Sequence, residues 1–283
     1  MIIVQSAGFS DIGKVRRKNE DSYLLNEPIG LYVVADGMGG HRGGEMASRM
    51  AIAAIDQYMS ASAIRADDRA RDEAGSPPNG KADRLIQSIR LANQQIYDRS
   101  VSDKAFRGMG TTVSALYLVD DTIVTANVGD SPIYLFRNRE IEKLYTPHTL
   151  LHERKKIPKS MVDRYSSKKL GHILTRAVGI RSDVKIDIVE TPCFKDDIIV
   201  LCSDGLSNKI SREEIRNLVS ENDIEDACRK MTASANQRGG EDNITVIAVR
   251  VVSSEKRSAE RLLGRMVRLP LKIASCLGFR RET

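Results

Sequence analysis

One glycine-rich stretch carries the strongest structural signal in the chain, Leu31-Tyr-Val-Val-Ala-Asp36-Gly37-Met38-Gly39-Gly40-His41-Arg42-Gly43-Gly44-Glu45. The apolar run at 31–35 predicts a short buried strand that ends on one carboxylate, Asp36. Five of the next eight residues are glycine, which lets the backbone turn sharply and approach a ligand. A carboxylate beside exposed carbonyls suits a hard cation. The plainer alternative is a tight strand-to-helix turn in which Asp36 caps the helix.

Size and composition describe an ordinary soluble protein. The chain has 283 residues, 41% hydrophobic and 29% charged, which is enough for a single large domain with a sizeable core. There is no Trp, which argues against a stacking platform for single-stranded nucleic acid. We expect free thiols in a reducing compartment, without a disulfide or zinc site, because no CxxC pair occurs among Cys193, Cys202, Cys228 and Cys276. No secretory signal and no run long enough to span a bilayer is visible, so we expect a cytoplasmic protein.

The basic charge is concentrated at the C-terminal end. The net charge is +6, and residues 253–283 hold eight basic and three acidic residues. The body at 1–252 is therefore close to neutral and is not expected to bind nucleic acid. In the tail, apolar residues alternate with arginines at helical spacing, which fits a segment on the inner face of an anionic membrane or on a partner protein. A helix packed on the body, or a disordered end, explains the same pattern equally well.

The order of predicted elements favours an α+β fold. Strands are expected at 2–12, 22–25, 31–35, 111–119, 122–128, 132–136, 141–144, 184–190, 197–202 and 244–251, and helices at 46–60, 82–102, 211–220 and 224–237. The polar segments 61–81 and 147–171 are expected to be surface loops. Strands followed by helices, twice over, suggest two antiparallel sheets packed together with helices outside.

Carboxylates recur where predicted strands end or begin, at Asp36, Asp130, Asp204 and Asp242, with Glu20 nearby. If these anions converged, they could not all stay ionised without cations between them. An oxygen-only ligand set selects Mg²⁺ or Mn²⁺ over zinc. Two ions sharing Asp36 could lie roughly 3.5–4 Å apart and hold a bridging water or hydroxide. That arrangement would hydrolyse a phosphoester by direct attack of water.

Seven short motifs follow one another along the chain. They are Arg16-Arg-Lys-Asn19-Glu20-Asp21, Ala35-Asp36-Gly37-Met38-Gly39-Gly40-His41, Gly108-Met-Gly-Thr-Thr, Val128-Gly-Asp130-Ser, Leu174-Thr-Arg-Ala-Val-Gly179, Ser203-Asp204-Gly205-Leu and Glu241-Asp242-Asn243. In this order they resemble the bacterial branch of the PP2C (PPM) family of metal-dependent serine/threonine phosphatases. The resemblance covers roughly residues 5–251 and implies a four-layer αββα sandwich, with a phosphatase domain at 1–252 and the tail at 253–283 outside it.

The resemblance also implies a metal-ligand set. Asp36 would bridge two core ions, and the carbonyl of Gly37 would help to hold one of them. Asp204 and Asp242 would complete the first metal site, and Glu20 would act mostly through metal-bound water. Asp130 and Asp204 would together form a third site that binds its ion more weakly.

Other residues would handle the substrate and the ligands. Arg16 matches the arginine that holds the substrate phosphate, and Asp21 and Asn243 would support the metal ligands. Many eukaryotic members place a histidine where this chain has Met38. His41 is nearby and could donate the proton to the leaving group, but metal-bound water could also do so, and His41 could equally be an exposed loop residue.

Two departures from the family pattern lie near Asp130. The family usually has Arg after Gly-Asp-Ser, and Pro132 stands there, which removes an ion pair behind Asp130. The family's Asp-His-Ser is Pro147-His148-Thr149 in this chain, and the segment 150–171 matches poorly.

These features predict hydrolysis of phosphoserine and phosphothreonine in proteins by a metal-bridged hydroxide. The expected partners are phosphorylated proteins, including a bacterial Ser/Thr kinase and its substrates, and we expect a monomer. The alternative is a non-catalytic phosphoprotein-binding or scaffolding module on the same fold. Such a module should have lost metal carboxylates, whereas this chain keeps all four Asp residues and Glu20.

Overall fold

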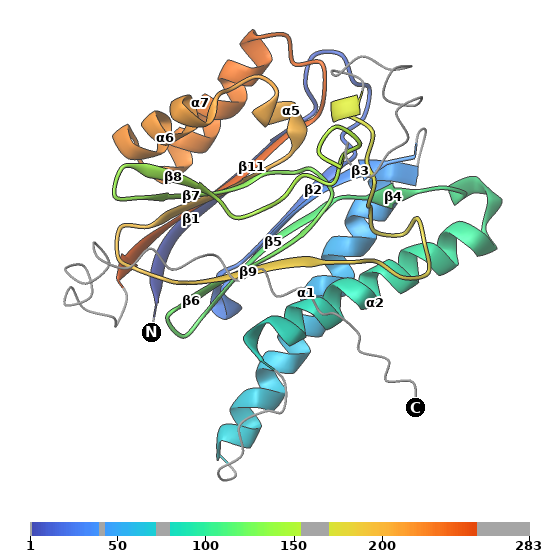
Figure 1. Cartoon of the computed structure of the whole chain (residues 1–283), viewed down its shortest axis with the longest axis horizontal. Coiled ribbons are helices and arrows are strands. Elements are labelled where there is room, and N and C mark those ends of the chain that lie inside the picture. Colours follow the sequence, from blue (N-terminus) through green and yellow to red (C-terminus); the bar gives the residue numbers. More distant parts are fainter. Residues whose placement is uncertain (1, 40–42, 72–79, 154–169, 254–283) are drawn as a thin grey trace.

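Two antiparallel sheets stack on each other and helices cover both outer faces (Figure 1). The computed structural model describes residues 2–39, 43–71, 80–153 and 170–253. The expected α+β, four-layer αββα sandwich is confirmed. The predicted tail at 253–283 lies outside the described residues except for Ser253, so its membrane or protein contact stays a prediction.

The first sheet has five strands in the order β1-β11-β10-β7-β8. They span Ile3–Asp11, Ile244–Ser253, Ile198–Cys202, Ile133–Arg137 and Glu140–Lys143. The second sheet has the order β2-β3-β5-β6-β9, and the short β4 also pairs with β3. Its strands span Asp21–Asn26, Leu31–Met38, Val113–Val119, Thr122–Val128, Asp187–Pro192 and, for β4, Gly110–Thr111.

Helices α1 (Gly43–Arg71) and α2 (Lys81–Ser102) pack on the six-stranded sheet. Helices α5 (Asp204–Ser207), α6 (Arg212–Glu221) and α7 (Ile224–Gln237) cover the five-stranded sheet. Short 3-10 turns lie at Glu27–Ile29 and Lys104–Phe106. Three apolar layers result, one under each helical layer and one between the sheets, and the central one includes Tyr32, Leu116, Leu135 and Ile247. This burial is the main stabilising contribution to the fold.

The structure corrects four predicted boundaries. Strand β3 continues through Asp36 and Gly37 to Met38, so the turn does not begin at Asp36. Helix α1 runs to Arg71 and replaces most of the loop predicted at 61–81, because Ala and Arg are strong helix formers. The predicted strand 111–119 is divided at Thr112. Strand β9 begins at 187 rather than 184, since its ladder with β6 ends at the pair Asn127–Asp187.

Other local expectations are confirmed. The hairpin between β7 and β8 turns at Asn138 and Arg139, whose φ angles of 51° and 67° are those of a tight two-residue hairpin turn. Three cysteines are buried as free thiols, namely Cys193, Cys202 and Cys228. Within the ranges that the structure describes, no helix has both the length and the apolar character needed to cross a bilayer.

Helix α6 begins with a capping box, which generates a stability prediction. The Ser211 hydroxyl accepts from the Glu214 amide (3.2 Å), and the Ser211 amide donates to the Glu214 carboxylate (3.0 Å). We expect Ser211→Ala to lower the free energy of unfolding by about 1 kcal/mol in urea denaturation, because an amide at the helix start loses its acceptor. Ser220→Ala, at an exposed position of the same helix, should leave it nearly unchanged. Equal effects would contradict the role of the cap.

Candidate metal centre

Carboxylates from both sheets face one another at one end of the sandwich. Asp36 lies in β3 of the six-stranded sheet, and Asp204 follows β10 of the five-stranded sheet at the start of α5. Asp242 precedes β11, and Asp130 follows β6. The charges of Asp21, Asp204, Asp242 and Asp130 all act on Asp36. The structure therefore brings together the four aspartates that the sequence singled out, although they are far apart along the chain.

Asp21 is the most isolated of these anions. It stands opposite Asp36 in the β2–β3 ladder and is 8% exposed. Neither of its carboxylate oxygens has a hydrogen-bond partner. The hydroxyls of Ser203 and Thr245 lie near enough to favour its ionised form, but burial outweighs them and raises its pKa. A buried carboxylate without a donor is costly, so Asp21 marks a place where positive charge is needed.

The pKa values of the other carboxylates are raised as well. Loss of solvent and the charges of Asp21, Asp204 and Asp242 raise the pKa of Asp36 well above its usual range. Burial is the largest cause, and the neighbouring charges add to it. Burial, followed by the charge of Asp204, raises the pKa of Asp130 to about 7. The pKa of Asp204 is also raised, by burial and then by Asp242.

Glycines at the end of β3 allow this close approach. A Cβ atom on Gly37 would lie 2.2 Å from the Gly44 carbonyl oxygen and 2.5 Å from that of Glu20. A Cβ atom on Gly44 would lie 2.8 Å from the Glu20 carboxylate. The Gly37 amide donates to the Glu20 carbonyl (3.2 Å), and the Glu20 amide donates to the Asn243 side chain (2.9 Å). Glu20 is thus held beside Gly37, where segments that lead into both sheets meet.

Thr112 fixes the backbone of Asp36. The Asp36 amide donates to the Thr112 hydroxyl (3.0 Å), and the Thr112 amide donates to the Asp36 carbonyl (2.8 Å). The same hydroxyl lies 2.8 Å from the hydroxyl of Ser131, the residue after Asp130. Thr112, which lies between β4 and β5, therefore connects the backbone of Asp36 to the turn that carries Asp130.

Arg16 contacts the cluster. The Arg16 guanidinium pairs with the Asp242 carboxylate at 2.9 Å, with both side chains partly exposed. The hydrogen bond to Asp242 raises the pKa of Arg16, and the charges of Glu20 and Asp36 act in the same direction. The predicted phosphate-binding arginine is therefore at the rim of the carboxylate cluster, where an incoming anion would meet it.

One titratable neighbour was missed from the sequence. His172 Nδ1 lies 3.7 Å from Asp204 Oδ2, and its charge would lower the pKa of both Asp204 and Asp130. No local signal could have found it, because it sits in an irregular segment whose path depends on tertiary packing. His41, the residue predicted as a proton donor, lies outside the described residues.

The donor set fits hard divalent cations. It consists of carboxylates and a backbone carbonyl, which are the ligands that Mg²⁺ and Mn²⁺ prefer, and the unpartnered Asp21 lies beside it, opposite Asp36 in the β2–β3 ladder. In the described ranges no three His, Cys, Asp or Glu side chains already form a shell that could hold an ion.

Comparisons with known proteins agree with this site. The family model described as "Protein phosphatase 2C" matches residues 16–246. The serine/threonine phosphatase stp of Listeria monocytogenes is 33% identical over 247 residues, which is 85% of this chain and 93% of that protein. Protein phosphatase PhpP of Streptococcus pneumoniae is 31% identical over 255 residues, covering 89% and 98%.

Solved structures lead to the same family. The catalytic domain of the serine/threonine protein phosphatase PstP, in complex with two manganese ions, is similar with a TM-score of 0.74 and 28% identity, covering 89% of this chain and 100% of that one. PppA, a regulatory component of T6SS in Pseudomonas aeruginosa, has a TM-score of 0.72 and 26% identity, covering 88% and 97%. The chain thus belongs to the protein phosphatase 2C family and is a metal-dependent protein phosphatase.

Proposed function

We propose that the chain hydrolyses phosphoserine and phosphothreonine in proteins and opposes a bacterial Ser/Thr kinase. The supporting observation is that carboxylates from both sheets converge around Asp36, with Asp21 unpartnered among them. Neither the relatives nor the complete carboxylate set favours the non-catalytic alternative. A kinase and its substrates are the proposed partners.

The metal ligands are assigned as follows. Asp36 would be shared by two core ions, with the Gly37 carbonyl, Asp204 and Asp242 completing their shells and Glu20 acting through water. Asp130 would hold a weaker third ion together with Asp204. Mn²⁺ or Mg²⁺ bound there would supply a water nucleophile active at neutral pH and would neutralise charge on the phosphate.

Arg16 would bind the substrate. Its planar guanidinium can donate two parallel hydrogen bonds to phosphate oxygens. In the structure it pairs with Asp242 across a partly exposed surface. When Asp242 is committed to an ion, the guanidinium would be available to the phosphate. The proton for the leaving alkoxide stays assigned to His41 or to water.

We expect hydrolysis of p-nitrophenyl phosphate and of a phosphothreonine peptide to require Mn²⁺ or Mg²⁺ and to stop in EDTA. Asp36→Asn and Asp204→Asn should each lower kcat/KM by about a hundredfold or more, because metal ions contribute several kcal/mol to transition-state stabilisation. The matched control is Asp98→Asn, at an exposed position of α2, which should retain activity. Full turnover in EDTA by pure protein would refute the metal-dependent mechanism.

We expect Arg16→Ala to lower kcat/KM by about 10- to 100-fold, since a hydrogen bond to a charged group contributes about 1.5–3 kcal/mol. Arg16→Lys should recover only part of the loss, because an ammonium cannot form the two-pronged contact. Steady-state kinetics on the phosphopeptide measures both. Arg17→Ala, the exposed neighbour, serves as the control, and a larger loss there would reassign the phosphate contact.

The raised carboxyl pKa values predict an unusual pH dependence for the metal-free protein. A carboxyl whose folded pKa exceeds its unfolded value of about 3.9 stabilises the fold below that pH, and the contribution is lost as the pH rises towards the folded pKa. For Asp130 that folded pKa is about 7, and the pKa of Asp21 is also raised. Urea denaturation of metal-stripped protein should therefore show stability falling between about pH 4 and pH 7.

The contribution of Asp21 can be isolated. Asp21→Asn removes the ionisable group at nearly constant volume, so the decline in stability with pH should be shallower in this variant. If the free energy of unfolding fell equally steeply with pH in the variant and in the wild-type protein, Asp21 would not contribute to the decline.

A further inference from the structure

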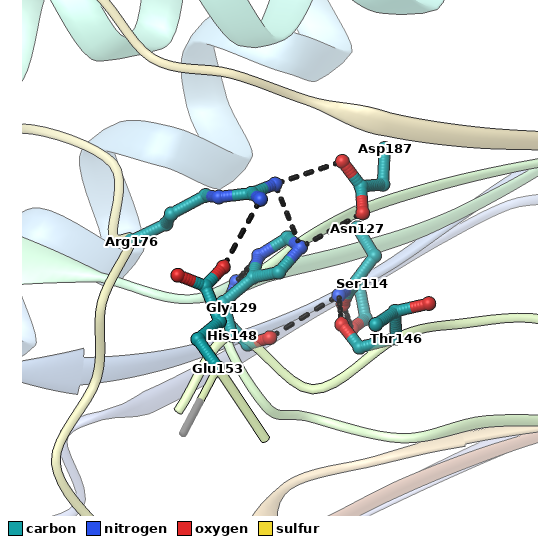
Figure 2. Close-up of polar contacts among 8 residues, drawn as sticks. All are labelled: Ser114, Asn127, Gly129, Thr146, His148, Glu153, Arg176 and Asp187. Carbon is teal, nitrogen blue, oxygen red and sulfur yellow. Dashed lines mark hydrogen bonds and ion pairs between the residues drawn. The ribbon is translucent and has the colours of Figure 1, made fainter. Parts of the chain in front are cut away.

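A buried histidine, His148, lies behind the turn that carries Asp130. Its side chain is 1% exposed. The Gly129 amide donates to His148 Nδ1 (3.0 Å), and the His148 amide donates to the Gly129 carbonyl (2.9 Å). One residue thus binds both polar backbone groups of the glycine before Asp130. Figure 2 shows the imidazole between Gly129 on one side and Asp187 and Arg176 on the other.

The hydrogen bonds fix the protonation of the ring. Since Nδ1 accepts from Gly129, the ring proton is assigned to Nε2, which lies 3.0 Å from both Asp187 Oδ2 and Arg176 Nη1. Both Nε2 and the guanidinium are then donors, so Nε2 donates to Asp187 and its approach to Arg176 is not a hydrogen bond. Arg176 donates to the other oxygen of Asp187 at 2.8 Å. The hydrogen bond from His148 and the charge of Arg176 lower the pKa of Asp187 to about 2. Asp187 therefore acts only as an acceptor near neutral pH, and it keeps Nδ1 free for Gly129.

Side chains from β5 and β6 also bind the backbone of this turn. Asn127 donates from its amide to the carbonyls of Gly129 (3.2 Å) and Thr146 (3.1 Å), and the Ser114 hydroxyl donates to the Ser131 carbonyl (2.6 Å). Gly129 has a φ of +112°, and a Cβ atom there would lie 2.6 Å from Thr112. The residues on both sides of Asp130 are thus fixed by buried side chains.

We propose that His148, oriented by Asp187, is a positioning residue that fixes the Gly129 turn and thereby directs Asp130 towards the metal centre. Pro132 stands where the family usually has an arginine, so the Gly129 turn depends on His148 without that arginine to support it. The inference goes beyond the proposed function and rests on it only where it assigns a metal ion to Asp130.

Two substitutions at His148 separate positioning from simple filling of space. His148→Asn keeps an acceptor where Nδ1 was but cannot reach Asp187. His148→Gln reaches Asp187 but offers Gly129 no acceptor. We expect Mn²⁺ binding at the weakest site, measured by isothermal titration calorimetry, to weaken about 10- to 100-fold in the Gln variant, as for losses of groups that support metal ligands. The Asn variant should remain closer to the wild-type protein.

Hydrogen exchange supplies a readout that needs no metal. In metal-free protein the Gly129 amide should stay protected in the Asn variant and lose protection in the Gln variant. The Mn²⁺ concentration giving half-maximal activity should rise in the Gln variant more than kcat falls. Equal behaviour of the two variants, or a Gln variant better than Asn, would overturn the proposal.

Asp187→Asn provides a second test if His148 variants fail to fold. His148 Nε2–H and Arg176 both donate to Asp187. An asparagine side chain has only one acceptor oxygen, so its NH₂ group would face one of these donors. The imidazole should then lose its orientation, and Mn²⁺ binding at the weakest site should weaken. Asp183→Asn removes an exposed carboxylate four residues earlier and should change nothing. Unchanged Mn²⁺ binding in Asp187→Asn would overturn the proposal.

The wild-type protein distinguishes the two levels of inference. If it binds Mn²⁺ and hydrolyses phosphopeptide while the variants match it, only the role of His148 fails. If the wild-type protein binds no Mn²⁺ and hydrolyses nothing, the proposed function fails and the role of His148 in it fails as well.

Discussion

Repulsion among carboxylates held between two sheets is the constraint on which the rest of the structure depends. Asp21 and Asp36 face each other across the β2–β3 ladder, and the charges of Asp204 and Asp242 reach them from the other sheet. Away from water such charges interact more strongly, and each loses hydration. Three apolar layers supply the opposing stabilisation. The fold thus supports a local arrangement that is unfavourable until cations join it.

Buried side chains, rather than β-ladders, hold the strand ends at this site. Thr112 binds both backbone groups of Asp36. Asn243 accepts from the Glu20 amide and donates to the carbonyls of Ile12 and Lys18 (2.9 Å each). His148 does the same for Gly129. Where strands end, the backbone groups need partners, and side chains that provide them also set the direction of the neighbouring carboxylates.

Prediction from the sequence succeeded where the signal is local. The alternation and turn residues located most strands, Ser211 marked the start of α6, and the carboxylates at strand ends were identified as one set. It failed where partners decide the outcome. Strand β3 runs past Asp36 because β4 pairs with Gly37 and Met38. Strand β9 starts late because its pairing with β6 begins only at Asp187.

The sequence by itself determined the types and order of the elements, the hard-oxygen character of the site and its likeness to one family, because these follow from periodicity, side-chain chemistry and motif order. Only the tertiary structure decided that Asp21 is the unpartnered anion, that Arg16 pairs with Asp242, that His148 binds Gly129 and that His172 approaches Asp204. These contacts join segments far apart in the chain, so they depend on how the two sheets pack and on the paths of the loops, which no local pattern encodes.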